Sequence, residues 1–181
     1  MDPQAWPRLT ALVLGPPGRR RARVSLALLA PVVYVVFAGV QHAEVLLGLV
    51  DRQESNLLTL FNLAGTFVFY LLIRSGASEA WRDPALTVPQ MAWGVLSMAG
   101  SYAITGPARG AVMSILVLIL VFGMFALRPA QARGLAFLAF GLLSAVMLWK
   151  SRTDPARYPP VVEAMHFVFG VMARWKFSGS S

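Results

Sequence analysis

Residues 111–127, AVMSILVLILVFGMFAL, carry no charged side chain and a single serine among aliphatic, aromatic and small residues. At about 1.5 Å per residue, a helix of this length is close to the hydrocarbon thickness of a bilayer. Arg128 and Pro129 follow directly, and a charge next to a helix breaker is typical of a membrane boundary. The segment therefore predicts a transmembrane helix.

The chain as a whole shares this apolar composition. Of its 181 residues, 57% are hydrophobic and 13% are charged, which is about half the charged share of a soluble domain. A soluble fold of this size cannot cover so much apolar surface. We therefore expect an all-α fold, built as an integral membrane bundle.

Apolar runs of comparable length flank this segment on both sides, at residues 24–50, 57–73, 86–104, 134–149 and 161–173. The last run is the weakest candidate because it is short and contains Glu163 and His166. The sequence thus predicts six transmembrane helices, with five as the alternative if the last run does not cross.

We expect the six-helix domain to cover residues 24–177, with a different segment at each end. Residues 1–23 form a cytoplasmic segment, in which Ala5 to Leu14 show an apolar stripe at helical spacing. The stripe predicts either a short interfacial helix or a tail without structure. Residues 178–181, Ser-Gly-Ser-Ser, resemble a linker or an appended tail, which suggests the membrane part of a larger protein.

The net charge of +8 is concentrated in the segments between apolar runs. With six helices and the N-terminus inside, eleven of the 16 Lys and Arg residues fall in inner segments and five in outer loops. This asymmetry predicts that both termini are cytoplasmic. Arginines beside apolar runs are typical of contact with lipid headgroups, so we expect the bilayer and no nucleic acid as a partner.

Ionisable side chains within the apolar runs are concentrated in the first and the last run. His42 and Glu44 lie towards the outer end of the first run, and Glu163 and His166 follow the outer start of the last run. The helical rise therefore places all four at a similar depth. Glu163 and His166 are three residues apart and share a helix face, and we expect His42, rather than Glu44, to join them.

These four residues are the candidate site for a ligand or cofactor, and several interpretations stay open. A transition metal suits His42, Glu163 and His166, and a haem suits two histidines on facing helices. A proton-responsive switch or a polar ligand pocket is the third interpretation. The structural alternative is that the groups reach the headgroup region or hydrogen-bond helices together. The chain has no cysteine, which excludes disulfides and thiolate metal sites.

Catalytic signatures are absent from the sequence. It contains no glycine-rich phosphate loop, no His-Glu-x-x-His and no nucleophile elbow, so we expect no enzymatic activity from this chain. Two other functions are open at this point. One is a small transporter or channel, and the other is an electron-transfer or other membrane protein that uses His42 and His166.

Several motifs lie in and after the second apolar run. Ile73-Arg74-Ser75-Gly76 is followed by Asp83-Pro84-Ala85-Leu86-Thr87-Val88-Pro89-Gln90-Met91, then by Gly106-Pro107-Ala108-Arg109-Gly110 and Phe122-Gly123-Met124-Phe125-Ala126-Leu127-Arg128. In this combination the chain resembles the membrane input domains of bacterial diguanylate cyclases over roughly residues 24–149. Physically, the prolines interrupt a helix, and we expect Thr87 to cap the helix that follows.

The resemblance implies a six-helix sensory domain in the bacterial inner membrane, joined in cis to a cytoplasmic cyclase module that makes cyclic di-GMP. The catalytic Gly-Gly-Asp-Glu-Phe module is not in this sequence, so cyclase activity would belong to the full-length protein. The resemblance also implies a homodimer. Its candidate interfaces are two faces of small residues, one with Gly94, Ser97 and Ser101 and the other with Gly141 and Ala145.

Overall fold

The structure is a computed structural model that describes residues 5–106 and 108–178, with side-chain surroundings for 10–106, 108–168 and 171. The described residues form helices and no strand. The elements are α1 (Ala5–Leu14), α2 (Arg19–Ala27), α3 (Leu29–Leu46), α4 (Arg52–Ser75), the short 3-10 helix η1 (Ala77–Ala80), α5 (Thr87–Ile104), α6 (Arg109–Ala126), α7 (Pro129–Thr153) and α8 (Pro160–Ser178). Residues 1–4, Pro107 and most of the predicted tail 178–181 lie outside the described residues.

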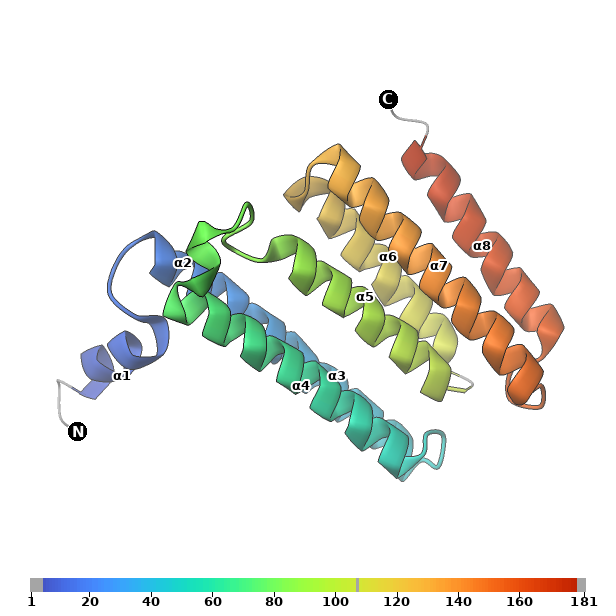
Figure 1. The fold of residues 1–181 in the computed structure, drawn as a ribbon. Coiled ribbons are helices and arrows are strands. Elements are labelled where there is room, and N and C mark those ends of the chain that lie inside the picture. Colours follow the sequence, from blue (N-terminus) through green and yellow to red (C-terminus); the bar gives the residue numbers. More distant parts are fainter. Residues whose placement is uncertain (1–4, 107, 179–181) are drawn as a thin grey trace.

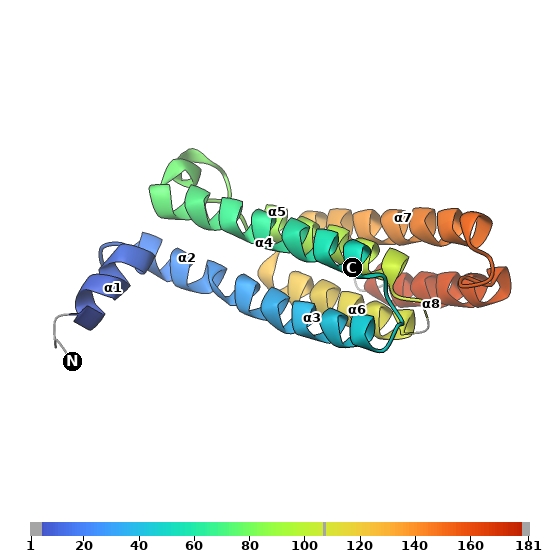
Figure 2. The same cartoon turned by 90° about the horizontal axis from the view of Figure 1, so that it is seen from below.

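The long helices run side by side in two layers. Figure 2 shows α4, α5 and α7 in one layer and α3, α6 and α8 in the other. Helix α5 packs against α4, α6 and α7, whereas α8 packs along α7 at one side of the bundle (Figure 1). One end of the bundle holds α2, η1, the α6–α7 turn and the end of α8, and the other holds the α3–α4, α5–α6 and α7–α8 connections.

Among the described residues, four segments are long and apolar enough to cross a membrane: Arg19–Leu46, Arg52–Ser75, Arg109–Ala126 and Pro129–Thr153. This finding confirms an all-helical protein with candidate membrane-spanning helices, although not the predicted number of six. Helix α5 contains Gln90 and Ser97, and α8 contains Glu163 and His166. These polar residues lower the hydropathy of two helices that are no longer than 18 and 19 residues.

The first predicted run, residues 24–50, is divided between α2 and α3 at Leu28. Pro31 explains the break, because proline lacks an N–H group and its ring excludes the carbonyl of the residue four positions earlier. Leu28 keeps right-handed helical angles, with φ −72° and ψ −9°, so α3 continues approximately along α2. A helix with a bend, rather than a straight span, therefore connects the basic segment to the bundle.

The motif around residues 74–91 forms a turn followed by a helix cap. Gly76 ends α4 with φ 83°, a left-handed conformation that favours glycine, and a Cβ there would approach Arg20 Nη2 to 2.6 Å. The Asp83 carboxylate accepts a hydrogen bond of 2.9 Å from the backbone N–H of Val88. The expectation that Thr87 caps this helix is wrong, because Thr87 is its first residue and Asp83 supplies the accepting oxygen.

The apolar core lies between α5, α6 and α7. Its buried members are Val95, Met98, Val112, Leu116, Leu135, Ala139, Leu143 and Met147. Helix α7 begins at Pro129, five residues before the predicted start at Gly134, because proline is well tolerated in the first helical turn. This core holds three helices rigidly beside each other, and polar groups gather at its end.

Candidate functional site

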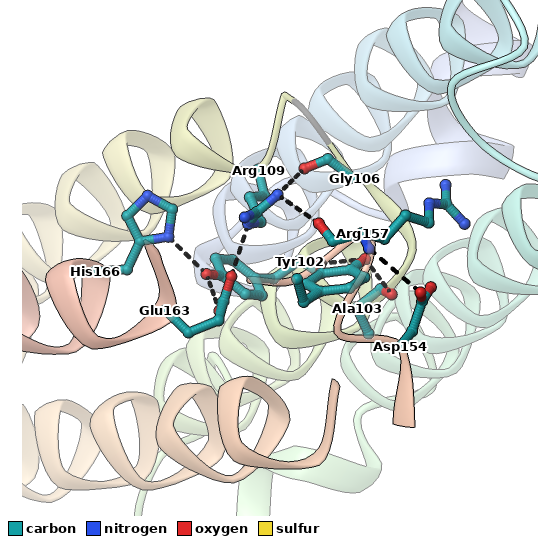
Figure 3. Close-up of polar contacts among 9 residues, drawn as sticks. Tyr102, Ala103, Gly106, Arg109, Asp154, Arg157, Glu163 and His166 are labelled. Atoms are coloured by element: carbon teal, nitrogen blue, oxygen red, sulfur yellow. Dashed lines mark hydrogen bonds and ion pairs between the residues drawn. The ribbon is translucent and has the colours of Figure 1, made fainter. Parts of the chain in front are cut away.

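A cluster of polar side chains lies where the α5–α6 and α7–α8 connections meet (Figure 3). We call it the end cluster and define it as Tyr102, Arg109, Tyr158, Glu163 and His166. The two tyrosines are fully buried, Glu163 is 4% exposed and Arg109 is 6% exposed. Burial of this many polar groups is unusual inside a helical bundle, and it requires partners for each of them.

Local structure brings these residues together from three helices. Tyr102 is in the last turn of α5, and Arg109 is the first residue of α6. Helix α8 begins at Pro160, where proline fits the start of a helix, and Glu163 and His166 occupy its first two turns. The tight α5–α6 connection at Gly106 and the turn after Asp154 therefore place the four side chains at one level.

Arg109 and Glu163 form a buried ion pair. The distance from Arg109 Nε to Glu163 Oε1 is 2.9 Å, and the two side chains are only 7% and 5% exposed. Arg109 Nη1 also donates to the carbonyl oxygens of Gly106, at 2.6 Å, and Arg157, at 3.2 Å. Removal of one partner from such a pair leaves an isolated buried charge, so the pair fixes α8 to α6.

The Tyr102 hydroxyl connects this pair to His166. It donates to Glu163 Oε2 at 2.7 Å, and it lies 2.8 Å from His166 Nδ1. Because a hydroxyl group has one hydrogen, its oxygen must accept the hydrogen bond from a protonated Nδ1. This tautomer is assigned from the hydrogen-bond network. His166 Nε2 is then the ring nitrogen that takes no part in the contact with Tyr102.

The α7–α8 connection is tied to the rest of this end by backbone carbonyls. The Tyr158 hydroxyl donates to the carbonyl of Ala103 at 2.7 Å, and Arg157 Nη2 donates to the carbonyl of Leu49 at 2.7 Å. The Arg109 guanidinium lies 5.0 Å from the centre of the Tyr158 ring, within the range of a cation–π contact. Burial raises the pKa of Tyr158 above its ordinary value of 10.0, which keeps this hydroxyl a hydrogen-bond donor.

The structure places two of the four predicted site residues close together. Glu163 and His166 lie together, as their spacing indicated, and both contact Tyr102. His42 is exposed and Glu44 is half-buried on α3, which packs against α2 and α4, away from α8 (Figure 1). Among the described residues, no group of three His, Asp or Glu side chains can hold a metal ion. The proposed metal set of His42, Glu163 and His166 is therefore not assembled, and neither is the pair of facing histidines that a haem needs.

Tyr102, Arg109 and Tyr158 are the members of the end cluster that sequence reasoning missed. A usable signal was nevertheless present, since Arg109 directly precedes the most apolar run and Glu163 follows the start of another. Two opposite charges at the same depth of adjacent spans predict an ion pair.

A second polar region lies between α3, α4 and α5. Its buried members include Gln41, Asn62 and Ser97, and Ser97 Oγ lies 3.4 Å from the hydroxyl of Tyr34. Within the described residues, Gln41 Oε1 and Asn62 Oδ1 are buried without a hydrogen-bond partner. Unpaired amide oxygens are costly in a membrane interior, so this region is less tightly bonded than the end cluster.

Comparison with protein-family models, curated proteins and solved structures finds no match for this chain.

Proposed function

We propose that this chain is a sensory input domain of the bacterial inner membrane, with six spans and both termini in the cytoplasm. In this proposal it regulates a diguanylate cyclase module in cis as part of a homodimer. The motifs of residues 73–128 support the cyclase connection by resemblance. Of the two candidate dimer faces, the one on α7 is accessible, because Gly141 and Ala145 are exposed whereas Ser97 and Ser101 on α5 are buried.

The arrangement of basic residues supports the orientation. The end of the bundle that contains α2 and the α4–α5 connection holds Arg19, Arg20, Arg21, Arg23, Arg74 and Arg82. The opposite end holds fewer basic residues, and Arg109 among them is neutralised by Glu163. The positive-inside rule assigns the more basic end to the cytoplasm, which is also where a cyclase module would act.

The end cluster is the observation that carries the sensory proposal. Helix α8 packs along α7, and the cluster supplies its charged link to α5 and α6. A proton or polar ligand that changes the cluster therefore changes the position of α8, the helix that leads towards the C-terminus. Such a stimulus acts by favouring one of two arrangements of α8. The charged and titratable groups around His166 are Tyr102, Arg109, Arg157, Glu163, Tyr158 and, on α7, Lys150.

The movement of α8 is directly measurable because the chain has no cysteine and only two histidines. Spin labels at Leu138→Cys and Val171→Cys report the α7–α8 distance by double electron–electron resonance. We expect the distance distribution to change across a screen of pH and polar ligands, and His166→Gln to abolish the change. His42→Gln is the matched control and should leave it intact. A distribution that is independent of pH and of a polar ligand screen would contradict the proposal.

The cyclase connection has a separate test. We expect the reading frame downstream of α8 to encode a Gly-Gly-Asp-Glu-Phe module, and Glu163→Gln in that full-length protein to change cellular cyclic di-GMP. A stop codon in its place would overturn this part of the proposal, and the α8 measurement would still stand.

The second polar region, between α3, α4 and α5, favours a second candidate function, that of a small transporter or channel. Unpaired polar groups such as Gln41 Oε1 and Asn62 Oδ1 are typical of substrate or ion pathways in membrane proteins. A flux assay in liposomes separates the two functions. Ion or solute flux that is lost in Asn62→Leu would favour transport, and its absence would leave the sensory proposal.

A further inference from the structure

An apolar groove lies between the α2–α3 junction and α4. It has a volume of about 580 Å³, and its lining residues are Leu28, Pro31, Leu63, Ala64, Thr66, Phe67 and Tyr70. The Thr66 hydroxyl donates to the backbone of its own helix, at 2.9 Å to the carbonyl of Leu63, so the wall presents no free polar group from this residue. The volume falls in the range of roughly 300–1,000 Å³ that is usual for small-molecule sites.

The sequence explains why the groove is there. Pro31 interrupts the helix at Leu28, and both residues line the groove on the side facing α4. Ala64 provides a small, exposed side chain opposite the bend. The groove therefore follows from a backbone feature and one small residue, rather than from loose packing of the core.

Both walls of the groove lead to an arginine. On α4, Leu63, Phe67, Tyr70 and Arg74 are spaced by four, three and four residues, which places them along one helix face. On the other wall, Arg21 precedes Leu28 by seven residues, so it shares that face about 10 Å further along. The apolar groove thus ends at positive charge on both sides.

This positive charge is in excess over nearby carboxylates. Arg20 is paired with Glu79, with contacts of 2.9 and 3.0 Å. Arg74 donates to the carbonyls of Ala11 and Leu12, and its Nε is buried with no partner among the described residues. Within the described part of the chain, Arg21 and Arg23 form no ion pair. An anion bound at this end of the groove would balance the unpaired positive charge.

We infer that the groove binds an anionic glycerophospholipid. An acyl chain lies against Pro31, Ala64 and Phe67, and the phosphate lies beside Arg21 and Arg74. A lipid is the occupant because the groove is apolar along its length and basic at one end, which matches a molecule with a hydrocarbon tail and a phosphate head. This site lies at the opposite end of the bundle from the end cluster and is independent of the sensory proposal.

The test is lipid retention by native mass spectrometry on protein purified in neutral detergent. Phosphatidylglycerol and phosphatidylcholine with identical acyl chains are added in equal amounts. We expect preferential retention of phosphatidylglycerol, and Arg21→Gln should weaken the preference about fivefold. Arg128→Gln/Arg133→Gln removes two exposed arginines away from the groove and should preserve the preference.

A second pair of variants tests the groove itself. Ala64→Phe fills it and should reduce retention of both lipids, whereas Ala126→Phe, at an exposed position on α6, should not. Equal retention of the two lipids by the wild type would overturn the proposal, as would an effect of Arg128→Gln/Arg133→Gln equal to that of Arg21→Gln. Displacement of the lipid by inorganic phosphate, with no effect of Ala64→Phe, would assign the arginines to a free anion and also overturn it.

Discussion

The two ends of the bundle use arginine in opposite ways. Arg109, at the end cluster, is buried, and its guanidinium contacts one carboxylate and two backbone carbonyls. Arg74, at the basic end, contacts carbonyls of α1 and leaves Nε without a partner among the described residues. One end is a closed network in which charge is neutralised within the protein, whereas at the other end Arg21, Arg23 and Arg74 have no carboxylate partner among the described residues.

This difference separates two roles of charge in a membrane protein. A neutralised, buried pair holds helices in one arrangement, and its removal is costly because the surviving charge has no alternative partner. Exposed charge contributes little to folding, but it is available to lipids or other anions. We therefore expect substitutions at the end cluster to change stability strongly and substitutions at the basic end to change it weakly.

The largest expected effect is at the ion pair. Glu163→Leu leaves Arg109 buried and unpaired and should lower the free energy of unfolding by about 3–5 kcal/mol. The double variant Arg109→Met/Glu163→Leu removes both charges and should recover most of this loss. Chemical unfolding in detergent micelles measures both values, and a double variant as unstable as the single one would show that the pair itself is not the cause.

A smaller effect is expected at the hydroxyl that connects the cluster. Tyr102→Phe removes the donor to Glu163 Oε2 and the acceptor for His166 Nδ1, and should cost about 1–3 kcal/mol because each of these atoms loses its hydrogen-bond partner. Tyr34→Phe is the matched control, since the Tyr34 hydroxyl makes one long contact of 3.4 Å with Ser97. The same unfolding measurement should show a clearly smaller loss for Tyr34→Phe, and equal losses would contradict the importance of the network.

The smallest effect is expected at the basic end and depends on pH. The hydrogen bond from Arg20 holds the pKa of Glu79 below its ordinary value of 4.5. A lowered pKa in the folded protein means that the pair stabilises the fold above pH 4.5 and that this contribution is lost as the pH falls through the lowered pKa. Arg20→Gln should therefore lower the Tm slightly at pH 7, with the difference vanishing in acid.

The matched control for this measurement is Arg19→Gln, at an exposed position of the same helix. It should leave the Tm and its pH dependence unchanged, and added salt should reduce the effect of Arg20→Gln. A difference that persists unchanged below pH 3 would contradict the assignment to Glu79.

Most helices were predictable from hydropathy because long apolar runs have few alternatives in a bilayer. The stripe at Ala5 to Leu14 left a short helix and a tail without structure as alternatives, and the structure has a helix over those residues. The division at Leu28 was missed because hydropathy does not register the effect of Pro31 on the backbone. The membership of the end cluster was half predicted, since spacing reveals that Glu163 and His166 share a face but not which helix lies opposite. Lateral neighbours depend on the packing of all helices, which is why Tyr102 rather than His42 is the partner.

The ion pair also constrains the order in which the protein is built. Arg109 is synthesised 54 residues before Glu163, so it leaves the translocon without its partner. Insertion of a charged residue at the centre of a helix costs about 2.5–3.5 kcal/mol, and both charges here lie near a helix end, where the cost is lower. Helix α8, the less apolar of the two, arrives when a complementary charge is already in place. The order of synthesis thus favours a docking step, in which α8 is retained by a residue that precedes it in the chain.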